Sequence, residues 1–248
     1  MAAPQGRDLH AVALCSLCNR YNFNMKLSII IPVFNEAENI ATTLTLLQSY
    51  RKQGHEVIVV DGGSQDNTIE LAQGVVDQLL ISKPGRAMQM NIGAELAEGD
   101  VLVFLHADTL LPDAADTLII DAIDQGNQWG RFNVRLSGQH ILFRVIETMM
   151  NWRSCLTGVA TGDHVIFVRR VLFEQTGGYP EIKLMEDIEL SKQLKPFGKP
   201  ACINTRVNTS SRKWENNGIF KTVLLMWKLR LLHFFGVSSE KLFSLYYR

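Results

Sequence analysis

Three segments in the first half of the chain are almost continuously apolar. They are Leu27–Val33, Glu56–Val60 and Val101–Leu105. Runs of this length and composition predict β-strands buried on both faces, as in a parallel sheet that is covered by helices. A shorter strand is expected over Gln78–Ile81.

Apolar residues recur at helical spacing between these strands. Ile40, Leu44 and Leu47 follow Asn35 and Glu38, whose separation resembles a capping box at a helix start. Further helices are expected over 66–73, 86–97 and 112–124. The alternation of strand and helix predicts an α/β fold with a mainly parallel central sheet flanked by helices.

The second half of the chain has a more mixed pattern. Strands are expected over 132–136, 165–168 and 201–207, and helices over 140–153, 186–195 and 219–235. With no repeat or Ser/Gly-rich linker, residues 25–215 are expected to form a single domain. Residues 1–24 match no element of this fold and are interpreted as an N-terminal extension, whereas residues 216–248 form a C-terminal amphipathic helix and tail.

The C-terminal helix combines a wide apolar face with basic residues. The apolar residues are Leu224, Leu225, Trp227, Leu231 and Phe235, and the basic ones are Lys221, Lys228 and Arg230. Three placements are open: packing on the domain, a homodimer interface, or a membrane surface. The stretch 222–237 is too short and too charged to span a bilayer. The expected location is cytoplasmic, either free or peripheral to the inner face of the membrane.

Composition narrows the classes of partner. The 248 residues include 25 Lys+Arg and 25 Asp+Glu, so the formal net charge is zero, and 46% of them are hydrophobic. This composition suits a packed core and excludes a disordered chain. The chain has no general attraction for nucleic acid, and an anionic ligand needs a local site.

The cysteines are too few for a disulfide scaffold at this length. They are Cys15, Cys18, Cys155 and Cys202. Cys15 and Cys18 form a lone CxxC, which is too little for a structural zinc site. All four are expected to be reduced thiols, as in a cytosolic protein.

Polar residues gather at the carboxyl ends of three predicted strands, where ligands bind in open parallel sheets. Asn35 and Glu36 follow the first strand, Asp61 begins the polar run after the second, and His106 and Asp108 follow the fourth. Each group also fits a simple turn or helix cap. Asp61 is the hardest to explain this way, because an acid directly after a buried strand is costly without partners.

His106 and Asp108 lie two residues apart, so in an extended stretch both face one side. An imidazole and a carboxylate can hold a divalent cation, and Mn²⁺ tolerates the nitrogen better than Mg²⁺ does. The alternative is a capped turn before Pro112.

Together these motifs resemble the family 2 glycosyltransferases of the GT-A fold, inverting enzymes that use nucleotide-diphosphate sugars. The matching segments are Ser28–Glu36, Val57–Thr68, Gly85–Ala94, Phe104–Asp108 and Met185–Gly198. The most similar subgroup is one of small soluble bacterial members with His-Ala-Asp in place of the family's DxD motif.

The resemblance implies a role for each matching residue. Asp187 is the general base and Glu186 shapes its surroundings. Asp108, with His106, holds a divalent metal, Mn or Mg, whose identity His106 leaves open because the family has Asp there. The residues expected to bind the donor are Pro32, Asn35, Glu36, Asp61, Ser64, Arg86, Asp163, Arg212 and Trp214.

The resemblance therefore implies transfer of a sugar from a nucleotide-diphosphate sugar to an unidentified acceptor, with a lipid-linked acceptor as one option. Two alternatives are a sugar-1-phosphate nucleotidyltransferase and a non-catalytic nucleotide-sugar binding protein. The first would carry a Gly-rich basic signature after strand one, which Pro32–Glu36 lacks. The second would need no Glu186 or Asp187.

Overall fold

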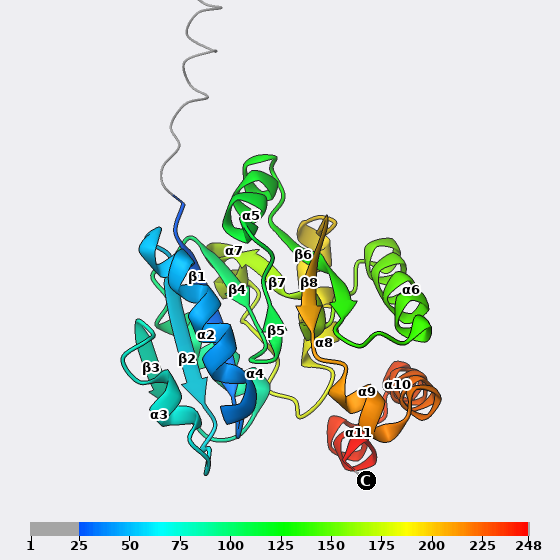
Figure 1. Ribbon diagram of the computed structural model, residues 1–248. Coiled ribbons are helices and arrows are strands. Elements are labelled where there is room, and N and C mark those ends of the chain that lie inside the picture. Colours follow the sequence, from blue (N-terminus) through cyan, green and yellow to red (C-terminus); the bar gives the residue numbers. More distant parts are fainter. Residues whose placement is uncertain (1–24, 248) are drawn as a thin grey trace, which may run out of the picture.

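An eight-stranded mixed sheet runs through the protein, and helices cover it (Figure 1). The computed structural model describes residues 25–247. The strand order is β3-β2-β1-β4-β7-β6-β8-β5. The first half of the sheet is parallel and consists of β1 (Leu27–Val33), β2 (Glu56–Asp61), β3 (Gln78–Ile81) and β4 (Val101–Phe104). The strands predicted in this half are confirmed.

Both faces of these strands are buried, as their apolar runs predict. Ile29 and Ile31 pack into one core cluster with Leu44 of α2, whereas Ile30 packs into another with Met90 of α4. This division follows from the alternation of side chains along a strand. The helices of this half are α2 (Ala37–Lys52), α3 (Thr68–Ala72), α4 (Arg86–Glu95) and α5 (Ala115–Asp124).

The second half of the chain completes the sheet with mixed pairing. β7 is antiparallel to β4 and to β6, β8 is parallel to β6, and β5 is antiparallel to β8. The strands are β5 (Thr109–Leu110), β6 (Trp129–Leu136), β7 (Ile166–Arg169) and β8 (Ala201–Thr209). The helices are α6 (Ile141–Thr157), α7 (Arg170–Gln175), α8 (Glu186–Leu194), α9 (Arg212–Asn217), α10 (Ile219–Phe234) and α11 (Ser239–Tyr246), with 3-10 turns η1 (Gly162–His164) and η2 (Lys195–Phe197).

The short elements β5, α7, α9 and α11 were not predicted, because segments of 2 to 8 residues carry little periodicity. The domain boundary predicted at residue 215 falls inside α9, and it stays a prediction. The extension over residues 1–24, with Cys15 and Cys18, lies outside the described residues. Within residues 25–247, no helix is long and apolar enough to cross a membrane.

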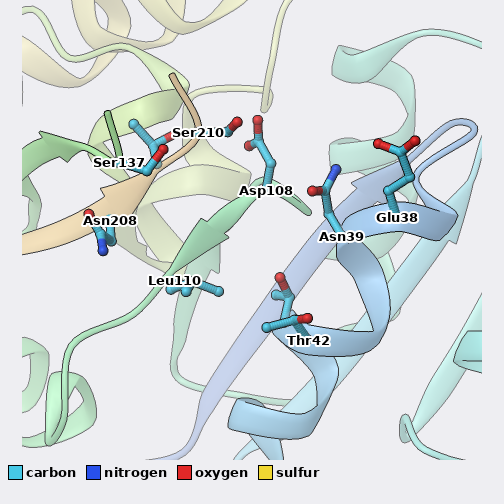
Figure 2. Close-up of a pocket in the computed structure, with 10 residues that line it drawn as sticks. Glu38, Asn39, Thr42, Asp108, Leu110, Ser137, Asn208 and Ser210 are labelled. Carbon is cyan, nitrogen blue, oxygen red and sulfur yellow. The ribbon is translucent and has the colours of Figure 1, made fainter. Parts of the chain in front are cut away.

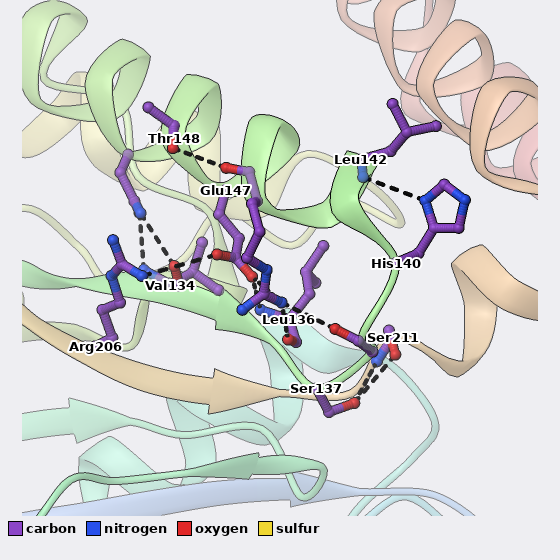
Figure 3. Close-up of polar contacts among 12 residues, drawn as sticks. Val134, Leu136, Ser137, His140, Leu142, Glu147, Thr148, Arg206 and Ser211 are labelled. Atoms are coloured by element: carbon purple, nitrogen blue, oxygen red, sulfur yellow. Dashed lines mark hydrogen bonds and ion pairs between the residues drawn. The ribbon is translucent and has the colours of Figure 1, made fainter.

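Helix α6 covers, with buried polar side chains, the part of β6 that extends beyond its pairing with β7 (Figure 3). The Val134 N–H donates to Oδ1 of Asn151 at 2.8 Å, and the Leu136 N–H donates to Oε1 of Glu147 at 2.7 Å. Glu147 is in turn paired with Arg144 at 2.7 Å. These bonds satisfy strand groups that would otherwise be buried without partners.

A disulfide joins Cys155 near the end of α6 to Cys202 in β8. The prediction of reduced thiols is therefore wrong for this pair. Two cysteines 47 residues apart give no sequence signal of their own, and only the packing of α6 beside β8 brings their Cα atoms to 6.0 Å.

Reducing this disulfide is expected to lower the free energy of unfolding by about 2–4 kcal/mol, because the bond restricts the unfolded chain. Urea unfolding with and without dithiothreitol measures the difference, and Cys155→Ser should abolish it. Equal stability of the wild type under both conditions would contradict the bond.

The apolar face of α10 faces away from the domain. The residues buried from α10 are Thr222 and Leu229, whereas Leu224, Trp227 and Leu231 are more than half exposed. Packing on the domain, one of the three open placements, therefore does not cover these three residues. Their helical periodicity identifies a face but not what covers it.

Candidate active site

The loops after β1 and β2 are bonded to each other at the carboxyl edge of the sheet. The Asn35 N–H donates to Oγ of Ser64, the Gln65 N–H donates to Oδ1 of Asn35, and both distances are 2.8 Å. The Glu36 N–H donates to Oγ1 of Thr68 at 2.9 Å. The two loops thus form one shaped rim.

Asn35 does not cap α2, so the expected capping box is wrong. Its φ is +54°, a left-handed conformation that asparagine tolerates better than most residues. α2 begins at Ala37, and the Glu36 side chain accepts no capping bond from the backbone of the helix. The Asn35 side chain instead accepts a hydrogen bond from the Gln65 N–H.

Asp61 is fully buried at the end of β2. Its Oδ2 accepts from the N–H groups of Gly63 at 2.7 Å and Ser64 at 2.8 Å, and its Oδ1 accepts from Oγ of Ser64. These bonds compensate for burial of the carboxylate. In the structure Asp61 shapes the loop, while its contact with base or ribose stays a prediction.

Gln89 of α4 is a positioning residue that the sequence did not reveal. Its Nε2 donates to the carbonyl oxygens of Val33 and Val60, both at 2.8 Å, and so joins the ends of β1 and β2. A Cβ on Gly62 would lie 3.2 Å from the Gln89 side chain, so a small residue suits that place. The sequence signal that could have indicated this role was a glutamine on the inward, otherwise apolar face of the helix.

The segment after β4 is a turn rather than an extended stretch. The Thr109 N–H donates to the carbonyl of His106 at 3.1 Å. The expectation that His106 and Asp108 face one side of an extended strand is therefore wrong. The His106 ring lies against η1, with Nδ1 3.8 Å from Oδ1 of Asp163, and Asp108 lines a different space.

Asp108 lines a cavity of about 180 Å³ between α2 and the end of β8 (Figure 2). Figure 2 shows it between Asn39 of α2 and Ser210. Burial raises the pKa of Asp108, and the charge of Arg212 opposes the shift. Arg212 is ion-paired with Glu38, which also lines the cavity.

The fit of a divalent cation to this region rests on Asp108. Across residues 25–247 the structure contains no cluster of three or more His, Cys, Asp or Glu side chains arranged for a metal. The Asp108 carboxylate receives one long bond, from Oγ1 of Thr109 at 3.4 Å, so it retains acceptor capacity. A magnesium ion is commonly held by one or two carboxylates plus substrate phosphates and water, which matches this arrangement.

Asp187 lies in the first turn of α8, after Met185 with a left-handed φ of +74°. Its Oδ2 accepts from the Gly162 N–H at 2.8 Å, and its buried Oδ1 has no partner in the described part of the chain. Burial, and then the charge of Glu186, raises the pKa of Asp187 to about 7. Glu186 is paired with Nη1 of Arg86 at 3.2 Å.

Gly162 brings the β4 end and α8 together. A Cβ at this position would lie 2.3 Å from the His106 ring and 3.3 Å from Oδ2 of Asp187. Only a residue without a side chain permits this approach. The base candidate and the end of β4 are therefore separated by a single backbone segment.

Cations surround the acids of this region. Burial and the charge of Asp108 raise the pKa of Asp163, whereas Arg86, Arg230 and Lys213 oppose the shift. Lys213 of α9 lies 3.2 Å from the ring centroid of Tyr246, which ties α11 to α9. Lys213 and Arg230 were missed because helix charges usually indicate a solvated face.

The remaining predicted donor residues lie at the edges of this region. Pro32 is half-buried near the end of β1, and Arg212 and Trp214 lie in α9, with Arg212 exposed and Trp214 half-buried. Glu36 is half-buried at the start of α2, and burial raises the pKa of its carboxyl. The assignment of all these residues to donor binding stays a prediction.

The family model described as "Glycosyl transferase family 2" matches residues 28–172, more than half of the chain. The chain belongs to this family. The matched segment contains the rim loops, the β4 turn and η1. Membership in a small subgroup with a His-Ala-Asp metal motif stays a prediction.

Curated relatives share part of the chain. Glycosyltransferase AglE of Haloferax volcanii is 43% identical over 90 residues, which cover 33% of this chain and 30% of the relative. An undecaprenyl-phosphate 4-deoxy-4-formamido-L-arabinose transferase of Yersinia pestis is 29% identical over 159 residues, covering 58% of this chain and 48% of the relative. The chain spans less than half the length of these relatives.

Solved structures show the same fold at low identity. TarS of S. aureus, residues 1–349 in complex with UDP, superposes with a TM-score of 0.60 at 19% identity, covering 75% of this chain and 60% of that chain. Mannosyltransferase PcManGT of Pyrobaculum calidifontis, in complex with GDP-Man and Mn²⁺, gives a TM-score of 0.56 at 21% identity, covering 74% and 56%. The predicted GT-A fold is confirmed.

Proposed function

We propose that this family 2 member is an inverting glycosyltransferase that moves a sugar from a nucleotide-diphosphate sugar to an acceptor hydroxyl or phosphate. One observation carries the proposal. Among residues 25–247, one carboxylate oxygen of Asp187 has no hydrogen-bond partner, and Gly162 alone separates the other oxygen from His106, which follows β4. Inversion needs a base on one side of the sugar and leaving-group stabilisation on the other.

Asp187 is the general base in this proposal. The Gly162 N–H fixes Oδ2, so Oδ1 is the oxygen that receives the proton from the acceptor. A base works best when its pKa lies near the working pH, and burial brings Asp187 there. Glu186 and Arg86 hold the start of α8 beside it.

In this proposal the leaving diphosphate lies between the Asp108 carboxylate and the Arg86 guanidinium. The Arg86 side chain is 44% exposed, so its guanidinium can reach a phosphate while still paired with Glu186. Asp108 would hold Mn²⁺ or Mg²⁺, which when bound supplies positive charge for the departing diphosphate. The Mn²⁺ in the complex of PcManGT supports a metal in this fold.

The rim loops are proposed to hold the nucleotide. Asp61 and Asn35 fix their shape, so Pro32, Glu36 and Ser64 are presented on a rigid edge. The ligands named for TarS and PcManGT, UDP and GDP-Man, support a nucleotide-diphosphate sugar as donor.

We propose a lipid-linked acceptor and a location beside the membrane. The name of the Yersinia relative, an undecaprenyl-phosphate transferase, supports a phosphate-bearing lipid. The positive charges of Arg230 and Lys213 oppose the rise in the pKa of Asp163, so both residues lie near that carboxyl. They are cations that could bind the phosphate of such a lipid.

A thermal-shift screen tests the donor part of this function. The purified chain is mixed with UDP-, GDP-, CDP- and dTDP-sugars, each with Mn²⁺, Mg²⁺ or EDTA. One nucleotide class with metal is expected to raise the melting temperature, because a ligand that binds the folded state stabilises it by mass action. Absence of a shift with all of them, and of nucleotide release, would contradict the proposal.

Activity is expected to fall as pH drops below about 7. The raised pKa of Asp187 means that its carboxyl becomes protonated there and can no longer accept a proton. Burial, followed by the charge of Arg86, lowers the pKa of His106 to about 3, so His106 stays neutral over this range and cannot cause the loss.

The pH dependence of kcat/KM for donor turnover measures this effect. Asp163→Asn serves as a control, because it removes another carboxyl with a raised pKa near Asp187 and should leave the decline in place. A kcat/KM that stays constant from about pH 5 to about pH 8 would contradict a base with this pKa.

A further inference from the structure

Two helices present apolar stripes that nothing in the described chain covers. On α6 the stripe consists of Ile141, Val145, Met149, Trp152 and Leu156, whose exposed fractions run from 51% to 71%. On α10 it consists of Phe220, Leu224, Trp227, Leu231 and Phe234, with exposed fractions from 58% to 80%. Each set recurs every three or four residues, so each lies along one side of its helix.

The opposite sides of these helices hold them on the domain. Phe143, Glu147 and Asn151 of α6 are buried against the sheet, and Thr222 and Leu229 of α10 are buried. The stripes are therefore fixed on a folded support. Figure 1 shows α6 and α10 next to each other on one side of the molecule.

The exposed charges on the two helices themselves are basic. α6 and α10 contain one acidic residue between them, Glu147, which is buried and paired with Arg144. Their basic residues are Arg144, Arg153, Lys221, Lys228 and Arg230, and both lysines are exposed. A rigid apolar surface flanked by bases complements an anionic lipid headgroup layer over an apolar interior.

We propose that the α6 and α10 stripes form a docking surface for an anionic phospholipid bilayer. Trp152 and Trp227 enter the interfacial region, and Lys221 and Lys228 contact lipid phosphates. This inference rests on the location beside the membrane proposed above and names the surface that contacts the bilayer; it does not depend on which acceptor is used.

The surface lies beside the helix that carries the base. His233 of α10 is paired with Glu189 of α8 at 2.7 Å, and Asp187 lies in the first turn of α8. A bilayer bound to the stripes would therefore lie near the base side of the site.

Vesicle flotation of the full chain tests the docking surface. Vesicles of phosphatidylcholine with phosphatidylglycerol are expected to carry the wild type, and vesicles of phosphatidylcholine alone to carry at least about tenfold less, because the bases contribute. High salt should weaken the binding through screening. The fluorescence of Trp152 and Trp227, two of the 4 tryptophans, should shift to the blue on binding.

Matched variants separate the surface from general stickiness. Trp152→Asn with Trp227→Asn should reduce flotation by at least about tenfold, and Lys221→Gln with Lys228→Gln should remove the preference for anionic vesicles. Val171→Asn, at a residue 61% exposed on α7, should float like the wild type. Circular dichroism checks that each variant is folded.

Three results would overturn the proposal. The first is that the wild type does not float with vesicles. The second is that it floats, but neither pair of substitutions changes the flotation. The third is that the wild type binds no vesicles and forms a dimer, which the tryptophan substitutions dissociate. The last result would assign the stripes to a second copy of this chain.

Discussion

Replacement of Asp187 by asparagine is expected to lower the kcat for donor turnover by about 10²–10⁴-fold, the usual contribution of a general base. The asparagine oxygen can still accept from the Gly162 N–H, which holds the side chain at 2.8 Å in the wild type. Removal of a buried negative charge should not destabilise the fold. The variant should therefore fold, bind the donor and fail in the chemical step.

Single-turnover kinetics and donor affinity measured on the same protein distinguish the chemical step from binding. Glu189→Gln is the matched control, because Glu189 lies in the same helix and pairs with Lys192 and His233 rather than with Arg86. It should retain near wild-type turnover. An Asp187→Asn variant with the same kcat as this control would exclude Asp187 as the base.

Replacement of Asp108 by asparagine is expected to lower kcat/KM by about 10²–10³-fold, since it removes negative charge from the proposed metal position. The wild type should lose activity in EDTA and regain it with Mn²⁺ or Mg²⁺. The variant should need much more metal for the same recovery, because its amide is a weaker ligand than a carboxylate.

Asp113→Asn controls for the loss of a nearby acid, because Asp113 is exposed and lies outside the Asp108 cavity. It should leave the metal titration unchanged. Full activity of the wild type in EDTA would remove the metal from the account, and an unchanged titration for Asp108→Asn would remove Asp108 as its ligand.

The parallel half of the sheet was predictable, because Leu27–Val33 and Val101–Leu105 are apolar on both faces. Strands of this kind are stable only when helices bury both faces of the sheet. The gathering of polar residues at the strand ends followed from topology. Asp61 illustrates the limit of this reasoning. Its burial was expected to need partners, and the structure supplies them from Gly63 and Ser64 rather than from a ligand.

The errors arose where contacts distant in sequence decide the conformation. Asn35 bonds to Gln65, and Cys155 meets Cys202, through pairings that no local pattern encodes. The turn at His106 was an open alternative that propensity did not favour clearly. The apolar face of α10 was recognised, but its exposure depends on how few of its residues meet the domain.

The sequence also did not reveal residues that act by position alone. Gln89 joins two strand ends through its amide, and Gly162 matters because His106 and Asp187 approach it from two sides. Neither glutamine nor glycine predicts such a role from the sequence, since both are common in helices and turns.

The anomeric configuration of the first-formed sugar tests the central claim most directly. Proton NMR follows the slow hydrolysis of the preferred donor by the wild type, with water as acceptor. Displacement assisted by Asp187 from the side opposite the diphosphate predicts that an α-linked donor first releases the β-sugar. Release of the α-sugar first would contradict the account.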